Sequence, residues 1–306
     1  MRIGEPARAK VNLTLSVLGR RADGYHELES LVTFAGVSDV VTIEAEADDR
    51  LTLSGTFARD IGGENLLTRT MALLRDAEPR LRIGSVHLQK EVPVAAGLGG
   101  GSADAAALLR AVRRANGELA GDVPWLEIAA RLGADVPVCL ADHPAVIRGK
   151  GEQMTPMPVL PAMHAVLVNP RLPLATGSVF AALRCGPASP PVQAPAPPEL
   201  PDVPRLLGYM RARGNDLEDA AAKLLPAIAE IKASLAAQAG CLCAAMSGSG
   251  PTCFAVFPTR ADARRSATAI AAARPDWWVE CTVLDGAPQE KTGPHPDLPH
   301  GRAQPE

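Results

Sequence analysis

A glycine-rich turn between a strand pattern and an alanine-rich helix pattern constrains the fold of this chain more than any other feature. It reads Pro93-Val94-Ala95-Ala96-Gly97-Leu98-Gly99-Gly100-Gly101-Ser102-Ala103-Asp104. Glycine lacks a Cβ atom, so a polyanion can approach the backbone closely, and a helix N-terminus offers unpaired N–H groups with partial positive charge. The stretch therefore predicts a phosphate-binding loop. A turn that only connects strand and helix is the alternative, but its glycines would then cost folding entropy without a function to explain them.

The spacing of the glycines excludes two common nucleotide-binding motifs. A Walker A loop needs a lysine directly after its last glycine, and Ser102 stands there instead. The dinucleotide fingerprint G-x-G-x-x-G fails at the same position, because its third glycine would fall on Ser102. The sequence thus predicts phosphate binding by a loop of a different kind.

The composition is that of a globular protein and excludes several classes of partner. The chain has 306 residues, 47% hydrophobic and 21% charged, with 31 Lys+Arg against 34 Asp+Glu. This acidic balance argues against nucleic-acid binding, and no apolar run reaches the ~18 residues of a membrane span. Since the N-terminus also lacks a signal-peptide core, we expect a cytoplasmic protein. The oligomeric state stays open.

Strand and helix patterns alternate along the chain and predict two α+β domains, over residues 1–155 and 156–285. The polar, proline-rich residues 286–306 predict a disordered tail. The segment 185–204 holds eight prolines, which predicts an extended surface loop.

Hydrophobic periodicity and turn residues give the expected elements. We expect strands over residues 11–18, 40–45, 50–53, 86–92, 242–246, 252–257 and 277–284. We expect helices over residues 65–77, 102–116, 217–239 and 261–273, and a short helix that ends at Gly133.

Phosphoryl transfer needs a carboxylate near the acceptor hydroxyl and a cation near the reacting oxygens. Lys10 lies among apolar strand residues, which predicts partial burial beside a partner; an edge lysine that reaches solvent is the alternative. Asp135 follows a helix end and could equally cap its own turn. Asp104, in the first turn of its helix, could complement the helix dipole or help to hold a metal.

Two further loops are candidates for ligand contact. Tyr25 and His26 lie in a polar, glycine-containing loop, where their rings could stack on a base; a half-buried Tyr25 that anchors the loop is the alternative. The small-residue loop Ser247-Gly248-Ser249-Gly250 could meet the same ligand as the glycine-rich turn, or form a tight turn only.

Several stretches together resemble the GHMP kinases, the galactokinase, homoserine, mevalonate and phosphomevalonate kinase group. Residues 93–103 resemble their central phosphate loop, and residues 246–251 resemble their C-terminal motif. Residues 7–13, 19–28 and 132–137 are similar to the branch of that family that acts on 4-diphosphocytidyl-2-C-methyl-D-erythritol. The matching stretches are spread over residues 1–285; the glycine loop alone would indicate only the superfamily.

The resemblance implies a two-domain α+β fold, with an N-terminal nucleotide-binding domain and a ferredoxin-like C-terminal domain. It implies ATP-dependent phosphorylation of the 2-hydroxyl of that substrate, in the non-mevalonate isoprenoid pathway. Two alternatives stay open: another small-molecule kinase of the homoserine, mevalonate or galactose type, and a nucleotide-binding module without catalysis. Only a cytidine-containing substrate gives the rings of Tyr25 and His26 a role.

The resemblance also implies residue roles. Asp135 would accept or orient the hydroxyl proton, and Lys10 would stabilise that carboxylate and screen the developing charge. Residues 93–103 would cradle the phosphates of ATP, bridged by Mg²⁺, for which no protein ligand is assigned.

Substrate contacts are implied for Asn12, Tyr25, His26, Thr176 and Phe180. Asn12 would contact the substrate beside the catalytic lysine, and Tyr25 and His26 would take the cytosine. Phe180 would stack on the cytosine, with Thr176 nearby. The chain departs from the usual family pattern at Ala103, where a second serine is frequent, and at Gly177, where a proline is frequent.

Overall fold

The computed structural model describes residues 1–63, 65–157, 160–188 and 198–285. The tail predicted at 286–306 and residues 189–197 of the proline-rich segment lie outside the described residues. The strands are β1 (Arg2–Asn12), β2 (Ser16–Arg20), β3 (His26–Glu44), β4 (Arg50–Ser54), β5 (Ser85–Gln89), β6 (Ala145–Gly149), β7 (Gln153–Pro156), β8 (Met163–Asn169), β9 (Cys243–Met246), β10 (Cys253–Phe257) and β11 (Trp278–Asp285). The helices are α1 (Leu66–Ala77), α2 (Gly100–Asn116), α3 (Trp125–Leu132), α4 (Val136–Ala141), α5 (Thr176–Ala182), α6 (Val203–Arg213), α7 (Glu218–Leu224), α8 (Ala227–Ala236) and α9 (Arg260–Ala273).

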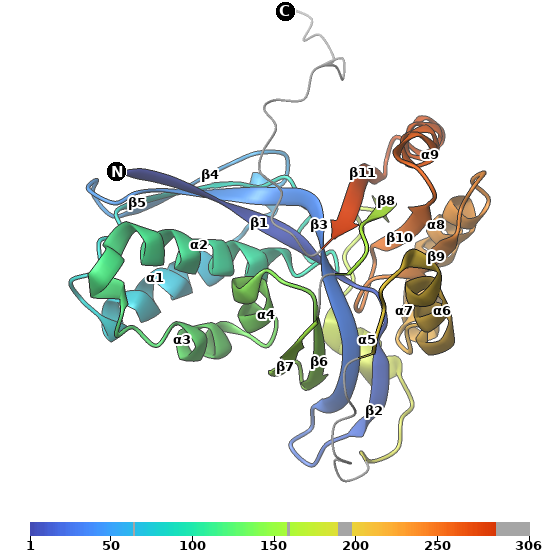
Figure 1. The fold of residues 1–306 in the computed structure, drawn as a ribbon, viewed down its shortest axis with the longest axis horizontal. Coiled ribbons are helices and arrows are strands. Elements are labelled where there is room, and N and C mark those ends of the chain that lie inside the picture. Colours follow the sequence, from blue (N-terminus) through green and yellow to red (C-terminus); the bar gives the residue numbers. More distant parts are fainter. Residues whose placement is uncertain (64, 158–159, 189–197, 286–306) are drawn as a thin grey trace, which may run out of the picture.

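The 19-residue strand β3 connects the two halves of the molecule. It pairs with β2 and β6 near its start, with β11 at Ala35, and with β5 near its end, while β1 runs antiparallel along most of it. The strands thus form one continuous sheet with the path β4-β5-β3-β11-β8-β10-β9. Figure 1 shows β3 rising from the lower end of the molecule into the N-terminal layer. Loops that are distant in sequence can therefore meet where the halves join.

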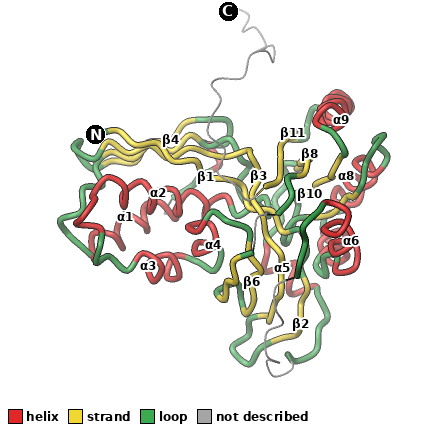
Figure 2. Tube along the Cα trace, in the orientation of Figure 1, coloured by secondary structure: helices red, strands yellow, loops and turns green. Residues whose placement is uncertain are grey.

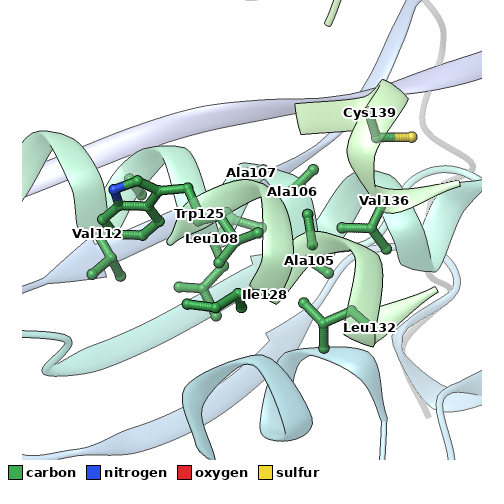
Figure 3. Close-up of a cluster of buried hydrophobic side chains, with 14 of the residues drawn as sticks. Ala105, Ala106, Ala107, Leu108, Val112, Trp125, Ile128, Leu132, Val136 and Cys139 are labelled. Atoms are coloured by element: carbon green, nitrogen blue, oxygen red, sulfur yellow. The ribbon is translucent and has the colours of Figure 1, made fainter. Parts of the chain in front are cut away.

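Four helices, α1 to α4, cover one face of the N-terminal part of the sheet (Figures 1 and 2). The central helix is α2, whose alanine-rich stretch allows its neighbours to approach closely. Figure 3 shows side chains of α2 packed against those of α3 and α4. The buried contacts include Leu108, Val112, Trp125, Ile128, Leu132, Val136 and Cys139. This packing holds the N-terminus of α2, and the glycine loop before it, at a defined place beside the sheet.

The C-terminal half has the strand–helix order and strand neighbours of a ferredoxin-like domain. Its four strands follow the order β11-β8-β10-β9, and each neighbouring pair is antiparallel. Helices α5 to α8 lie between β8 and β9 in the chain, and α9 lies between β10 and β11. The predicted α+β class is confirmed, with β9 and β10 paired around the small-residue loop.

Several predicted elements are wrong in extent. The expected strand 11–18 is divided between β1 and β2, and the expected strand 40–45 is only the end of β3. The expected helix 217–239 is two helices, because Pro226 cannot donate a backbone hydrogen bond and lies between α7 and α8. Helix α2 also begins two residues earlier than expected, at Gly100.

Candidate active site

The phosphate loop, residues 93–103, leads into the N-terminus of α2. Gly99 precedes the helix with φ +62°, a conformation that favours glycine. The first hydrogen bond of this turn runs from the Ala103 N–H to the Gly99 carbonyl, at 2.8 Å. The N–H groups of residues 100–102 therefore have no partner within the helix and are available to an anion.

The second glycine loop, residues 247–250, interlocks with the phosphate loop. The hydroxyl of Ser247 donates to the Gly97 carbonyl at 3.1 Å. Gly97 has φ +73°, and a Cβ atom there would lie 2.5 Å from the carbonyl oxygen of Gly250. The two small-residue loops thus meet, and glycine is required at their contact.

Replacing Gly97 by alanine is expected to disrupt this contact. The variant Gly97→Ala should lose about 2–4 kcal/mol of unfolding free energy, because positive φ strain adds to overlap with backbone carbonyls. Gly63 is a matched control, since it has φ +50° and a Cβ there would meet nothing within 4 Å. Gly63→Ala should cost about 1 kcal/mol in the same urea titration. Equal losses of unfolding free energy in the two variants would contradict a close contact between the two glycine loops at Gly97.

Lys10 and Asp135 form an ion pair beneath the phosphate loop. Lys10 Nζ lies 2.9 Å from Asp135 Oδ1, with 5% of the lysine side chain exposed and 35% of the aspartate side chain. The backbone N–H of Lys10 donates to the Leu98 carbonyl at 2.9 Å, and a Cβ on Gly99 would lie 3.2 Å from Lys10 Cε. The buried ammonium therefore supports a carboxylate that stays accessible from the cavity described below.

Helix α4, which follows directly after this carboxylate, is fixed to β1 by two arginines. Arg110 donates to the carbonyls of Cys139 in α4 and Pro6 in β1, both at 2.6 Å. Arg8 is buried on β1, and its Nη1 atom lies 3.7 Å from Oδ1 of Asp142, the residue directly after α4. These contacts hold the two elements that carry the ion pair in one orientation.

Asn12 lies beside this pair on β1. Its backbone N–H donates to Ser247 Oγ at 3.1 Å, and its side-chain Nδ2 donates to Ser30 Oγ at 2.8 Å. Its Oδ1 atom is buried and has no hydrogen-bond partner within the described part of the chain. Because a buried acceptor usually has a partner, this oxygen is well placed to accept a hydrogen bond from a ligand.

Two adjoining cavities are lined by most of the predicted site residues; Pro93, Val94, Leu98 and Ala103 line neither. The central cavity has a volume of about 440 Å³ and is lined by the phosphate loop, the second glycine loop and the ion pair. The outer cavity has a volume of about 770 Å³ and is lined by Tyr25 and His26, among others. The residues that line both cavities are Leu28, Lys150, Thr176 and Phe180.

Aromatic rings lie at the outer cavity. His26 stacks on Phe180 with ring centroids 4.8 Å apart. Burial of the imidazole and the positive charge of Arg20 both lower the pKa of His26. Tyr25 is 58% exposed, so it does not anchor its loop by burial. Thr176 Oγ1 lies 2.9 Å from Ser249 Oγ, which connects α5 to the second glycine loop. The structure thus gathers all the predicted substrate residues around the two cavities.

A buried charge cluster below the phosphate loop was missed by sequence reasoning. Lys90 Nζ lies 2.6 Å from Asp39 and 2.7 Å from Asp104. Burial raises the pKa of Asp104 to about 7. For Lys90, burial acts to lower the pKa, but the two carboxylate partners outweigh it, and the pKa of Lys90 is raised. Asp104 pairs with this lysine through Oδ2, while its Oδ1 is buried without a hydrogen-bond partner among the described residues. Because Asp104 does not line the central cavity, its suggested role as a metal ligand there is not supported. The available signal was a lysine at the end of an apolar strand, directly before the loop.

The two departures from the family pattern have different surroundings. Ala103 is 2% exposed and packs into the core, so a hydroxyl at this position would not line either cavity. Gly177 lines the outer cavity, and a Cβ there would meet nothing within 4 Å.

Within the described residues, no group of three or more His, Cys, Asp or Glu side chains is placed to hold a metal. Of the helices described, none is long and apolar enough to cross a membrane.

Comparison with known proteins agrees with this geometry. Residues 65–150 match the sequence profile "GHMP kinases N terminal domain", and residues 199–276 match "GHMP kinases C terminal". A 4-diphosphocytidyl-2-C-methyl-D-erythritol kinase from Rhodopseudomonas palustris (strain ATCC BAA-98 / CGA009) is 49% identical over 294 residues, which cover 93% of this chain and 98% of the relative.

Solved structures show the same relationship. A crystal structure of 4-(cytidine 5'-diphospho)-2C-methyl-D-erythritol kinase superimposes with a TM-score of 0.74 at 34% identity, covering 93% of this chain and 100% of that chain. A homoserine kinase from Cytophaga hutchinsonii ATCC 33406 shares the fold, with a TM-score of 0.63 at 17% identity and coverage of 94% and 96%. The chain therefore belongs to the GHMP kinase family, with its two-domain α+β fold, and within it to the branch of the 4-diphosphocytidyl-2-C-methyl-D-erythritol kinases.

Proposed function

We propose that this protein transfers the γ-phosphoryl group of ATP to the 2-hydroxyl of 4-diphosphocytidyl-2-C-methyl-D-erythritol. The observation that carries the proposal is the Lys10–Asp135 pair, 2.9 Å apart, in the central cavity below the phosphate loop. The relatives named above support the choice of acceptor.

ATP binds with its phosphates on the phosphate loop and the N-terminus of α2, where N–H groups have no partner within the helix. A third cavity, of about 190 Å³, adjoins the central one and shares Leu66, Ala95 and Gly101 with it. Its walls include Ile61 and Val94, whose apolar side chains suit the faces of a purine. The nucleoside of ATP therefore extends into this third cavity.

The acceptor occupies the other two cavities. Its cytosine lies in the outer cavity, against the aromatic rings of Tyr25, His26 and Phe180. Its methylerythritol end reaches the central cavity, where the free Oδ1 of Asn12 accepts a hydrogen bond from a hydroxyl. This placement directs the 2-hydroxyl towards Asp135.

Asp135 takes the proton of the 2-hydroxyl as the new O–P bond forms and the bond between the γ-phosphorus and the β,γ-bridging oxygen breaks. The buried Lys10 ammonium balances the carboxylate before transfer and stabilises the charge on the reacting oxygens during it. The fixed contact between β1 and α4 keeps both groups in place.

Mg²⁺ fits this site as a companion of ATP. Magnesium is usually held by substrate phosphates and only one or two protein groups, so the absence of an acidic cluster among the described residues is compatible with it. The hydroxyl of Ser102, which lines the central cavity in the first turn of α2, is the side-chain oxygen that would hold it. The ion would neutralise phosphate charge.

The test is an assay with ATP, magnesium and the cytidylated methylerythritol, with phosphorus NMR of the product. We expect ADP and a new phosphomonoester signal, and homoserine as a control acceptor should remain unphosphorylated. Preferred turnover of homoserine would favour another GHMP kinase activity. ATP binding without phosphorylation of any acceptor would favour a nucleotide-binding module.

Replacing Lys10 tests its catalytic role. Lys10→Ala should lower kcat about 10²–10³-fold, because a preorganised charge at the reacting oxygens is lost. Lys223, an exposed lysine on α7 that lines neither the central nor the outer cavity, is the control, and Lys223→Ala should leave kcat unchanged. Initial rates at saturating substrates measure both variants. A kcat for Lys10→Ala within threefold of the unsubstituted enzyme would remove this lysine from the mechanism.

A further inference from the structure

We propose that the ammonium of Lys150 binds the diphosphate that links the cytidine and methylerythritol parts of the acceptor. The inference rests on the proposed function and adds a residue that neither the glycine-loop motif nor the catalytic pair requires. It follows from where one charged side chain lies between the two cavities.

Lys150 is held at the tip of a tight hairpin between β6 and β7. Its neighbours Gly149 and Gly151 have φ +72° and +115°, and its own backbone N–H donates to Glu152 Oε2 at 2.7 Å. A Cβ on Gly151 would lie 3.1 Å from the Cβ of Ala134, so the turn packs beside the residue that precedes Asp135. The backbone therefore fixes the origin of this side chain close to the catalytic carboxylate.

The Lys150 side chain extends towards the outer cavity. Its Nζ lies 5.1 Å from the centroid of the Tyr25 ring, a distance suited to a cation–π contact. Among the described residues no carboxylate forms an ion pair with this ammonium, although Asp23, two residues before Tyr25, is close enough to interact with it electrostatically. The charge is thus positioned by an aromatic ring and remains available to an anion.

Lys150 is the charged residue among the four that line both cavities. An acceptor with its cytosine in the outer cavity and its 2-hydroxyl at Asp135 must pass this shared boundary. Between those ends lie the ribose and the diphosphate, and only the diphosphate carries negative charge. An ammonium at this place therefore meets the phosphate oxygens and not the base or the sugar alcohol.

The triphosphate of ATP is the other possible anion. The phosphate loop lines the central cavity and not the outer one, whereas Tyr25, below the ammonium, lines the outer cavity and not the central one. Lys150 Nζ therefore lies on the acceptor side, and we assign it to the diphosphate of the acceptor.

The test is calorimetric binding of CDP, cytidine and ATP to the full-length protein and to Lys150→Met. We expect CDP to bind about tenfold more weakly to the variant, because a charge-assisted contact to phosphate is lost, whereas cytidine and ATP should bind within twofold of the unsubstituted protein. Lys150→Arg should recover most of the CDP affinity. Added salt should weaken CDP binding to the unsubstituted protein more than to Lys150→Met.

Lys223→Met is the control for the loss of one positive charge, and it should leave all three affinities unchanged. Unchanged CDP affinity in Lys150→Met would overturn the assignment. So would an equal loss for cytidine, which would mean that Lys150 acts only through the Tyr25 ring, or a loss for ATP instead of CDP. These measurements need no turnover, so they separate failure of this assignment from failure of the proposed kinase activity, which the phosphorus NMR assay detects.

Discussion

Asp135→Asn is expected to lower kcat about 10³–10⁴-fold while the dissociation constant of ATP stays within twofold. The amide has nearly the shape of the carboxylate but cannot take the proton of the acceptor hydroxyl, and general-base catalysis typically contributes a factor of this size. ATP affinity should persist because, in the proposed mechanism, the phosphate loop and not Asp135 binds its phosphates. Stopped assays of product formation and calorimetry with ATP measure the two quantities.

The control for this variant is Asp48→Asn, at an exposed carboxylate in the turn between β3 and β4. It should leave kcat and ATP binding unchanged. A kcat for Asp135→Asn close to that of the unsubstituted enzyme would show that the acceptor loses its proton by another route, and the proposed mechanism would then fail.

Lys90→Met is expected to lower the free energy of unfolding by about 3–5 kcal/mol, because it leaves two buried carboxylates without their cation. The lysine side chain is 2% exposed, and its ammonium is the charged partner of both Asp39 and Asp104. ATP affinity should fall as well, since a Cβ on Gly100 of the phosphate loop would lie only 3.1 Å from Lys90 Nζ. Urea denaturation and ATP calorimetry check the two effects.

Matched variants separate charge from packing in this cluster. Asp104→Asn alone should cost much less than Lys90→Met, because the remaining Lys90–Asp39 pair carries no net charge. Adding Asp104→Asn to Lys90→Met should recover part of the lost stability, since one uncompensated carboxylate is removed. A loss below about 1 kcal/mol for Lys90→Met would mean that the carboxylates take up protons at little cost, contrary to this interpretation.

The glycine loop was predictable from sequence because its signal is local. Consecutive glycines before a helix pattern indicate an anion site by backbone chemistry alone, and Gly99 and Gly100 lie where that argument places them. The proximity of Lys10 and Asp135 is not local. Only the resemblance to a family suggested that pair, and the structure brings the two side chains within 2.9 Å.

The parts that sequence reasoning missed depend on tertiary contacts. Most of β3 was missed because its first half carries polar residues, such as Glu29 and Thr33, that do not fit an apolar strand pattern. In the folded protein both are buried, and Glu29 forms an ion pair with Arg148. Lys90 and Lys150 were missed because an isolated lysine does not reveal its partners or the cavity that it faces. The break in the helix pattern near Pro226 was a local signal that the apolar periodicity outweighed.

In the proposed binding mode, strand β3 also sets the length of acceptor that fits. His26, its first residue, lines the outer cavity, and Ser30, four positions along, lines the central cavity and accepts from Asn12. At the rise of an extended strand, four residues span about 13 Å. In this binding mode, the separation between the base and the reacting end is set by strand backbone that is paired with its neighbours. We therefore expect selection for linker length to depend on the scaffold and not on adaptable side chains.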